Sequence, residues 1–425
     1  MKKRLHSYVY SVVKSVTALG LLFAGFQQGA AQLAVDSTMP EDLSLQEPAE
    51  DTVMNIPARV GLVIRNLSTG RNVVERNPEM FFTPASVMKT VTSAAAVING
   101  HIDRRYATEA FTEGAISGGK LYGNLVVVAS GDPTTDSKRF IGNHGIVDSI
   151  AAHMRKLGVD TIRGQIVFET GAVPDDGPSV NWPRADLKYD YGAGHYAINY
   201  KDNTIEGTDK AIADPVGAFY DALEEALASR GVAVLDEKIH IRAKRHKIYR
   251  QESPTFREIL HDMMVRSDNL FAEAMLRRLA PGKSPAMALH QERRLISKIG
   301  IDTTRIKIFD GSGLSRKNSV TPNAIADVLE NMAQSKWSKS YTDLFPRAGV
   351  NGTVRRLLAE TPLAGKIALK SGSMRGVQCW AGYKFNSKGR PTHAIVFLIN
   401  DFSCPRDSVV KAAEKVMLDN FDYYN

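Results

Sequence analysis

The most informative stretch of this chain is residues 84–89, Pro84-Ala85-Ser86-Val87-Met88-Lys89, which sets a serine and a lysine three residues apart at a predicted helix start. A proline favours the first turn of a helix, and small and apolar residues then continue to Gly100, a residue typical of helix ends. Residues three apart lie on one helix face, so the Lys89 amine can reach the Ser86 hydroxyl. The helix N-terminus favours negative charge developing there. Ser86 is therefore a candidate nucleophile and Lys89 its candidate base.

The Ser-x-x-Lys pattern alone is weak, because it occurs four times, about as often as chance composition gives for this length. The serines are Ser11, Ser86, Ser117 and Ser408. Ser11 lies in the apolar N-terminal segment, Ser117 in a glycine turn before a strand, and Ser408 in the last predicted helix. Only Ser86 opens a helix after a proline.

A second polar motif, Ser267-Asp268-Asn269, interrupts the helical pattern between residues 261 and 279. A triplet there can direct a hydroxyl and an amide into a cleft between two subdomains. The alternative is that Ser267 and Asn269 are solvated helix residues. Ser179-Val180-Asn181 has the same short pattern, but its loop setting between two prolines fits less well.

A third motif, Lys370-Ser371-Gly372-Ser373, contains the only Lys-Ser/Thr-Gly of the chain. It ends a β-type run, where a glycine lets a substrate backbone approach an exposed strand edge. Lys370 supplies positive charge for a substrate carboxylate, Ser371 a hydroxyl, and the strand a backbone donor. Taken alone, the motif is equally a basic strand end followed by a turn.

The order of predicted elements indicates an α+β fold. A hairpin is expected from residue 59, and three strands are expected at 365–371, 376–385 and 392–400, before a closing helix at 406–419. Helices dominate between them, so the terminal strands are predicted to share one antiparallel sheet covered by helices. We assign residues 58–105 and 250–425 to this catalytic domain. Residues 106–249 mix strands and helices and are predicted to form an inserted α/β subdomain.

The N-terminal segment has the three parts of a secretory signal: basic residues, an apolar stretch and small residues at 29–31. We predict a signal peptide at 1–31, followed by an acidic tether at 32–57. The alternative is that this segment is retained as an N-terminal anchor. No later stretch approaches the roughly 18 to 20 apolar residues needed to span a bilayer. The segment 1–31 holds half of the formal charge of +8. The remaining charge is dispersed, so we expect no nucleic-acid binding and at most peripheral membrane association.

The three motifs, in this order and on these elements, are the signature of penicillin-binding proteins and class A β-lactamases. The chain resembles the penicillin-recognising serine enzymes and, more narrowly, the low-molecular-mass class C penicillin-binding proteins of peptidase family S13, a D-Ala-D-Ala carboxypeptidase/endopeptidase group. The narrower resemblance rests on Gly131-Asp132-Pro133-Thr134, on Trp182-Pro183 followed by Asp186, and on the run from Asp310 to Arg316. Two features depart from the family pattern. Ser371 stands where the family often has threonine, which keeps the hydroxyl. The distance between the first two motifs is shorter than in the largest members, which implies a reduced insertion without the small third domain of those members.

The resemblance implies the penicillin-binding/β-lactamase-type transpeptidase fold and an acyl-enzyme mechanism on peptidoglycan stem peptides, inhibited by β-lactam antibiotics and located in the periplasm. Ser86 would attack the penultimate D-Ala carbonyl, Lys89 would take its proton, and Ser267 would relay a proton to the leaving amine. Asn269 would hold the peptide amide, and Lys370 with Ser371 and the Gly372 strand would hold the terminal carboxylate. The backbone N–H groups of Ser86 and Ser373 would bind the oxyanion.

The resemblance also implies a pocket that reads a diaminopimelate-type side chain. Asp186 would bind its amine, Arg316 its carboxylate, and Met374 would form an apolar wall. The alternative is that Asp186 caps a turn and Arg316 pairs with a surface acid. No metal or other cofactor is expected.

Competing functions have weaker support in the sequence. A serine β-lactamase shares the three motifs, but the large middle insertion and the Asp310 to Arg316 run argue against it. The loss of Ser86 or Lys89 would favour a catalytically silent cell-wall binding or scaffold protein of the same fold. Both residues are present in this sequence. A metallopeptidase lacks an HExxH motif, and a conventional serine triad lacks a GxSxG elbow.

The two cysteines, Cys379 and Cys404, belong to no zinc-binding pattern. In an oxidising compartment they can pair, and we predict a disulfide that ties the strand after Lys370 to the start of the last helix. Two separate thiols are the alternative.

Overall fold

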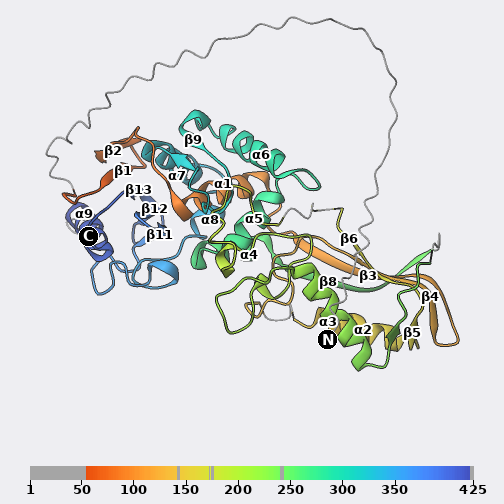
Figure 1. Cartoon of the computed structure of the whole chain (residues 1–425). Helices are drawn as coiled ribbons and strands as arrows, with labels where there is room; N and C mark the ends of the chain where they lie inside the picture. Colours follow the sequence, from red (N-terminus) through yellow and green to blue (C-terminus); the bar gives the residue numbers. More distant parts are fainter. Residues whose placement is uncertain (1–53, 141–143, 172, 174–176, 240–243, 422–425) are drawn as a thin grey trace, which may run out of the picture.

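The computed structural model describes residues 54–140, 144–171, 173, 177–239 and 244–421 (Figure 1). The predicted signal peptide at 1–31 and tether residues 32–53 lie outside the described residues. Across the described residues, no helix has the length and apolar character that crossing a membrane requires.

A five-stranded antiparallel sheet joins the two ends of the described chain. Its order is β11-β12-β13-β1-β2. The strands are β1 (Arg59–Asn66), β2 (Arg71–Arg76), β11 (Ile367–Met374), β12 (Val377–Phe385) and β13 (Pro391–Asn400). β1 pairs with β13 over its whole length, from Arg59 opposite Asn400 to Asn66 opposite His393. The predicted sharing of one sheet by N- and C-terminal strands is confirmed.

Both faces of this sheet are buried, which explains why β13 is apolar without alternation. Along β13, Val396 and Leu398 pack into the core on one face, whereas Phe397 and Ile399 pack into the core on the other. Figure 1 shows α9 on one side of the sheet and the remaining helices of this part on the other. The helix on the first side is α9 (Arg406–Phe421). Those on the other side are α1 (Met88–Asn99), α4 (Phe256–Arg266), α5 (Asn269–Arg277), α6 (Pro285–Ser297), α7 (Pro322–Gln334) and α8 (Ser338–Thr342).

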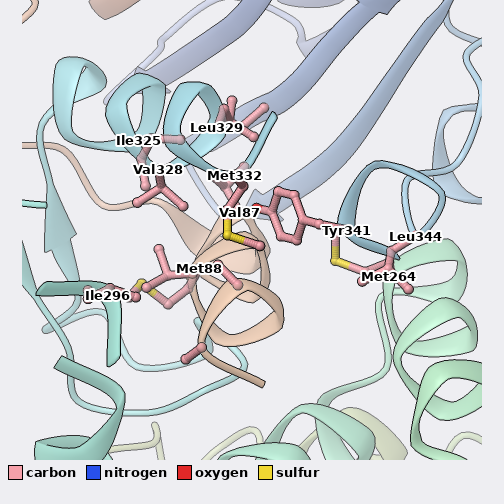
Figure 2. Packing of buried hydrophobic residues seen from close by; sticks show 14 of the residues in the cluster. Val87, Met88, Met264, Ile296, Ile325, Val328, Leu329, Met332, Tyr341 and Leu344 are labelled. Atoms are coloured by element: carbon pink, nitrogen blue, oxygen red, sulfur yellow. The ribbon is translucent and has the colours of Figure 1, made fainter. Parts of the chain in front are cut away.

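The start of α1 is anchored inside the larger core. Figure 2 shows Met88 facing Val328 of α7 and Ile296 of α6, with Tyr341 of α8 close by. Met88, Val328 and Ile296 are completely buried. Burial of such side chains stabilises the fold by roughly 1.5–3 kcal/mol each. This packing fixes the residues on either side of Met88.

The middle of the chain forms a second, mixed sheet with its own core. Its order is β7-β5-β4-β3-β8, and β6 also pairs with β4. The elements are β3 (Arg105–Ser117), β4 (Lys120–Val128), β5 (Thr161–Ile162), β6 (Ile166–Glu169), β7 (Ala233–Val234), β8 (Arg245–Thr255), α2 (Ile146–Lys156) and α3 (Pro215–Ser229). The side chains of α2 and α3 share one core with β4 and β6. β8 runs on to Thr255 and α4 begins at the next residue, while the predicted limits of 106 and 249 stay a prediction.

Short elements complete the described chain. They are the two-stranded pair β9 (Ile306–Lys307) and β10 (Ser319–Val320) and the 3-10 helices η1 (Ala85–Val87), η2 (Asp190–Gly192), η3 (Lys201–Asn203), η4 (Thr303–Arg305) and η5 (Gly352–Val354). η1 leads directly into α1 and lies against β11.

The predicted disulfide is wrong in this structure, where Cys379 and Cys404 are both free. Cys379 on β12 points into the helix-covered core, and its thiol contacts the Thr83 carbonyl at 3.6 Å. Cys404 packs against the core on the opposite face, beside α9. The sheet therefore separates the two sulfur atoms.

Candidate active site

Ser86 and Lys89 meet at the junction of η1 and α1. The Lys89 side chain is completely buried, whereas Ser86 is partly exposed. Lys89 Nζ lies 3.0 Å from Ser86 Oγ and also donates to Asn269 Oδ1 at 2.6 Å and to the Ser312 carbonyl at 2.7 Å. An ammonium has three protons, so these contacts match its donors. After losing one proton, the amine can keep both other bonds and direct its lone pair to the Ser86 hydroxyl.

Burial makes that neutral form accessible. Desolvation lowers the pKa of Lys89 to about 8, although the negative charges of Asp268, Asp310 and Glu273 act in the opposite direction. Near neutral pH, Lys89 is therefore neutral in an appreciable fraction of the protein molecules. A neutral amine can accept a proton, as a general base must.

Ser267, Asp268 and Asn269 form the sharp junction between α4 and α5. α4 begins with a capping box of Thr255 and Glu258, and it ends at Ser267, whose φ of 64° is left-handed. The Asp268 side chain then caps α5 by accepting from Phe271 N at 2.9 Å. The predicted interruption of the helix is confirmed. It turns both the Ser267 hydroxyl and the Asn269 amide towards the buried lysines.

Lys370 on β11 is the second buried cation of the site. Its Nζ donates to Ser267 Oγ at 2.8 Å and to the Ser371 carbonyl at 2.6 Å. Burial and the charge of Lys89 together hold the pKa of Lys370 well below its usual value. The structure thus links all three motifs, with Ser86 and Asn269 bonded to Lys89 and Ser267 bonded to Lys370.

Gly372 allows β11 to lie directly against η1. A Cβ at this position would lie 2.7 Å from the Pro84 carbonyl and 2.9 Å from Ser86 N. Contacts that short do not occur for side chains, so only glycine fits without a shift of the backbone. Ser371 Oγ donates to Thr353 Oγ1 at 2.6 Å, and Ser373 is exposed at the strand edge.

A cleft of about 480 Å³ opens over these groups. Ser86, Ser267, Ser371 and Ser373 line it, together with Arg356 and Arg406. The buried lysines lie behind this wall of hydroxyl groups. The cleft therefore combines a candidate nucleophile, Ser86, with several hydrogen-bond donors and two exposed guanidinium groups.

The loop from Asp310 to Ser315 forms the floor beneath Ser86. Buried Asp310 accepts bonds from Gly313 N at 2.8 Å and Ser315 N at 2.6 Å. A Cβ on Gly313, whose φ is 83°, would lie 1.9 Å from the Ala85 carbonyl. The close turns of this loop explain the glycine and small residues in the Asp310 to Arg316 run.

The three residues predicted to bind a substrate side chain lie on separate segments, with Asp186 and Arg316 in loops and Met374 at the end of β11. Asp186 Oδ1 accepts from Tyr191 Oη at 3.2 Å, Arg316 Nη2 donates to the Arg375 carbonyl at 3.2 Å, and Met374, which precedes Arg375, is half-buried. The described contacts join Arg316 to Arg375, the residue after Met374, and join neither Arg316 nor Met374 to Asp186. The 181–186 loop is nevertheless fastened to the cleft floor, because Trp182 Nε1 donates to Asp310 Oδ2 at 2.8 Å.

Several residues of the site were not predicted from the sequence. The Tyr191 carbonyl accepts from Asn269 Nδ2 at 2.8 Å, which brings the middle of the chain into the catalytic cleft. Arg356, Arg406 and Thr353 also line or support it. A backbone carbonyl carries no signal in sequence, and these side chains belong to no short motif.

The competing motifs lie elsewhere. Ser117 is exposed at the end of β3, and Ser408 is exposed on α9. Ser179 accepts from Asn181 N within its own loop. Across the described ranges, no group of three or more His, Cys, Asp or Glu side chains is arranged to hold a metal ion.

Comparison with solved structures bears first on the fold. The fold is similar to the crystal structure of penicillin binding protein 4 (dacB) from Haemophilus influenzae, with a TM-score of 0.75 at 22% identity over 85% of this chain and 96% of that one. A structure of the same protein complexed with a novel β-lactam has a TM-score of 0.68 at 23% identity. These likenesses confirm the predicted fold class.

Sequence comparison then gives the family. The D-Ala-D-Ala carboxypeptidase 3 (S13) family matches residues 44–211 and 201–421, so the chain belongs to that family and is a serine-type D-Ala-D-Ala carboxypeptidase. The chain is 25% identical to the D-alanyl-D-alanine carboxypeptidase DacB of Haemophilus influenzae, over 88% of this chain and 92% of the relative. It is also 25% identical to the D-alanyl-D-alanine carboxypeptidase of Actinomadura sp. strain R39, over 89% of this chain and 83% of that relative. The predicted resemblance is confirmed.

The close approach at Gly372 yields a prediction. Gly372→Ala should slow acylation by a fluorescent penicillin at least tenfold, because the new Cβ pushes β11 away from Ser86 N and the loss of about 1.4 kcal/mol of transition-state stabilisation has that effect. Gly171→Ala is the control, since a Cβ there meets nothing within 4 Å and its φ is not positive. Equal acylation rates of the two variants, measured by stopped-flow fluorescence, would contradict the importance of this contact.

Proposed function

We propose that Ser86 is the acylated nucleophile and that Lys89 is its general base. The observation that carries this proposal is the position of the buried Lys89 amine, 3.0 Å from Ser86 Oγ and bonded on its other sides to Asn269 and Ser312. In this arrangement the amine has one direction in which to accept a proton, towards the serine. Attack of Ser86 Oγ on a carbonyl carbon then gives a tetrahedral intermediate.

The oxyanion of that intermediate is bound by the backbone N–H groups of Ser86 and Ser373. Support comes from Gly372, whose lack of a side chain lets the strand carrying Ser373 lie against η1. Donors fixed in the backbone stabilise developing charge without reorganising, which is the basis of an oxyanion hole.

Ser267 gives its hydroxyl proton to the leaving amine and takes one back from Lys370, while the proton removed from Ser86 stays on Lys89. Lys370 Nζ donates to Ser267 Oγ at 2.8 Å, which leaves the hydroxyl proton of Ser267 free to be given away. Burial and the charge of Lys89 both lower the pKa of Lys370, so a state in which only one of the two lysines is charged is favoured over a state in which both are charged. Water then hydrolyses the acyl-enzyme and restores Ser86.

The substrates proposed for the cleft are peptidoglycan stem peptides that end in D-Ala-D-Ala, and β-lactams are its inhibitors. Relatives of this chain are named D-alanyl-D-alanine carboxypeptidases, and one neighbouring structure contains a β-lactam. Lys370 and Ser371 hold the terminal carboxylate, and Asn269 holds the peptide amide by exchanging its bond with the Tyr191 carbonyl. The proposed location is the periplasm, reached through the signal peptide at 1–31.

We further propose that Asp186, Arg316 and Met374 select peptides with a diaminopimelate-type side chain. Asp186 and Arg316 carry the charges opposite to the free amine and carboxylate of that side chain, and Arg316 donates to the carbonyl of Arg375, the residue after Met374. Asp186 already accepts a bond from the Tyr191 hydroxyl, so the side-chain amine would join or replace that contact.

Ser86→Ala should abolish covalent labelling by a fluorescent penicillin, and Lys89→Ala should suppress it almost as fully, because an unassisted hydroxyl is a poor nucleophile at neutral pH. Ser408→Ala is the matched control, since this Ser-x-x-Lys serine is exposed on α9. Peptide mapping that finds the label on Ser117 or Ser408 would disprove the assignment.

Asp186→Ala should reduce kcat/KM for peptides with the free side-chain amine by about tenfold or more, as loss of one charged hydrogen bond of about 1.5–3 kcal/mol implies. Penicillin acylation and turnover of short acetylated D-Ala-D-Ala analogues should change little. An equal loss on all substrates, measured by release of D-Ala, would instead mean that Asp186 supports the fold through Tyr191.

A further inference from the structure

Among the buried acids of the described residues that the mechanism leaves unused is Glu292 on α6, which is completely buried. Its Oε1 lies 2.7 Å from Thr92 Oγ1, and its Oε2 is buried without a hydrogen-bond partner among the described residues. An ionised carboxylate with one oxygen left unpaired in a protein core is costly. The protonation state of the Glu292 carboxyl group therefore needs a structural explanation.

Thr92 connects Glu292 to the catalytic floor. It lies one helical turn beyond Lys89 on α1, and its Oγ1 is also 2.8 Å from the Gly311 carbonyl. The next carbonyl along the loop, that of Ser312, accepts from Lys89 at 2.7 Å. Two side chains on one face of α1 thus hold two consecutive carbonyl groups of the loop beneath Ser86.

The same peptide segment is held from its other side. Glu273 Oε1 on α5 accepts from Gly311 N at 3.1 Å and from Ser312 N at 2.9 Å. Gly311 itself is tightly packed, because a Cβ there would lie 3.0 Å from the Ala272 carbonyl. The Ser312 carbonyl that orients Lys89 is therefore placed by contacts from both α1 and α5.

Counting protons decides the state of Glu292. The Thr92 hydroxyl has one proton, and two oxygens lie within hydrogen-bond distance of it. The Gly311 carbonyl can only accept, so it takes the Thr92 proton. The short contact to Glu292 is then attractive only if the carboxyl group carries a proton and donates it to Thr92.

We propose that Glu292 is a neutral carboxylic acid that positions Lys89 indirectly, by donating to Thr92, which in turn donates to the Gly311 carbonyl. Glu292 is a positioning residue, since it does not touch the substrate. The inference rests on the proposed function only where acylation is the readout.

The charges around Glu292 agree with this state. Glu273 on α5 and Asp310 on the floor loop face it as acids, and Arg293 on α6 is the neighbouring cation. Burial, followed by the charges of Glu273 and Asp310, raises the pKa of Glu292 to about 8, against the effects of the Thr92 hydrogen bond and of Arg293. The acid form should accordingly persist at pH 7 and be lost as the pH rises through about 8.

Infrared spectroscopy tests the protonation directly. The difference between the wild-type and Glu292→Gln spectra at pH 7 should contain the C=O band of a buried, protonated carboxylic acid, and this band should disappear above about pH 8. Thr92→Val keeps Glu292, so in this variant the band should remain but change frequency, because the acid loses its acceptor. If carboxylate bands appear instead at pH 7, or if the wild-type band is identical in Thr92→Val, the inference is wrong.

Acylation by a fluorescent penicillin tests the positioning role. Thr92→Val should slow acylation about tenfold, as loss of a buried hydrogen bond of about 1.4 kcal/mol implies. Glu292→Gln should keep most of the rate, because its amide N–H can replace the acid as donor to Thr92. Thr90→Val is the matched control, since the Thr90 hydroxyl is equally buried on α1 but donates to the Val87 carbonyl.

Equal rates for Thr92→Val and Thr90→Val would overturn the positioning role. A failure of the proposed function looks different, because then no protein, wild type included, would be acylated at Ser86. The infrared result would still decide the state of Glu292.

Discussion

The site depends on one constraint, the burial of the Lys89 ammonium beneath Ser86. Burying an unpaired charge is prohibitively costly, so the fold must surround this amine with acceptors. It does so with Ser86 from η1, Asn269 from the start of α5 and the Ser312 carbonyl from the floor loop. Three segments far apart in sequence are thereby fixed relative to one another. The same burial lowers the pKa of Lys89 to about 8, which connects the packing of α1 with the chemistry of a base.

Much of the remaining structure supports that arrangement. The core around Met88 fixes the start of α1, Gly372 brings β11 against η1, and Asp310 folds the floor loop through its hydrogen bonds to Gly313 and Ser315. The middle of the chain takes part as well, because the Tyr191 carbonyl holds the Asn269 amide and Trp182 donates to Asp310. Trp182 and Tyr191 therefore tie this segment to the candidate site, and a change at Tyr191 can reach the lysine through Asn269.

The sequence predicted those parts of the molecule that local patterns encode. Ser86 and Lys89 follow a proline at a helix start, the Ser267 motif breaks a helix, and the Lys370 motif ends a strand, so each element could be predicted from short windows. Contacts across long distances could not. The bond from Asn269 to the Tyr191 carbonyl leaves no trace in residue types, and Thr92 and Glu292 look like ordinary helix residues until their helices are packed together. The pairing of Cys379 with Cys404 was wrong for the same reason, since the face of the sheet on which each sulfur lies depends on the whole fold.

The central claim is that Lys89 reaches its neutral form near physiological pH while remaining in the folded protein. The most direct measurement is an NMR titration of protein labelled at the lysine side chains, in which the Lys89 signal is assigned by its loss in Lys89→Ala. The account predicts that this signal titrates near pH 8, far below the usual lysine value of 10.5. A Lys89 signal that stays that of a charged ammonium up to pH 10 would contradict the account, because the amine bonded to Ser86 could then not serve as its base.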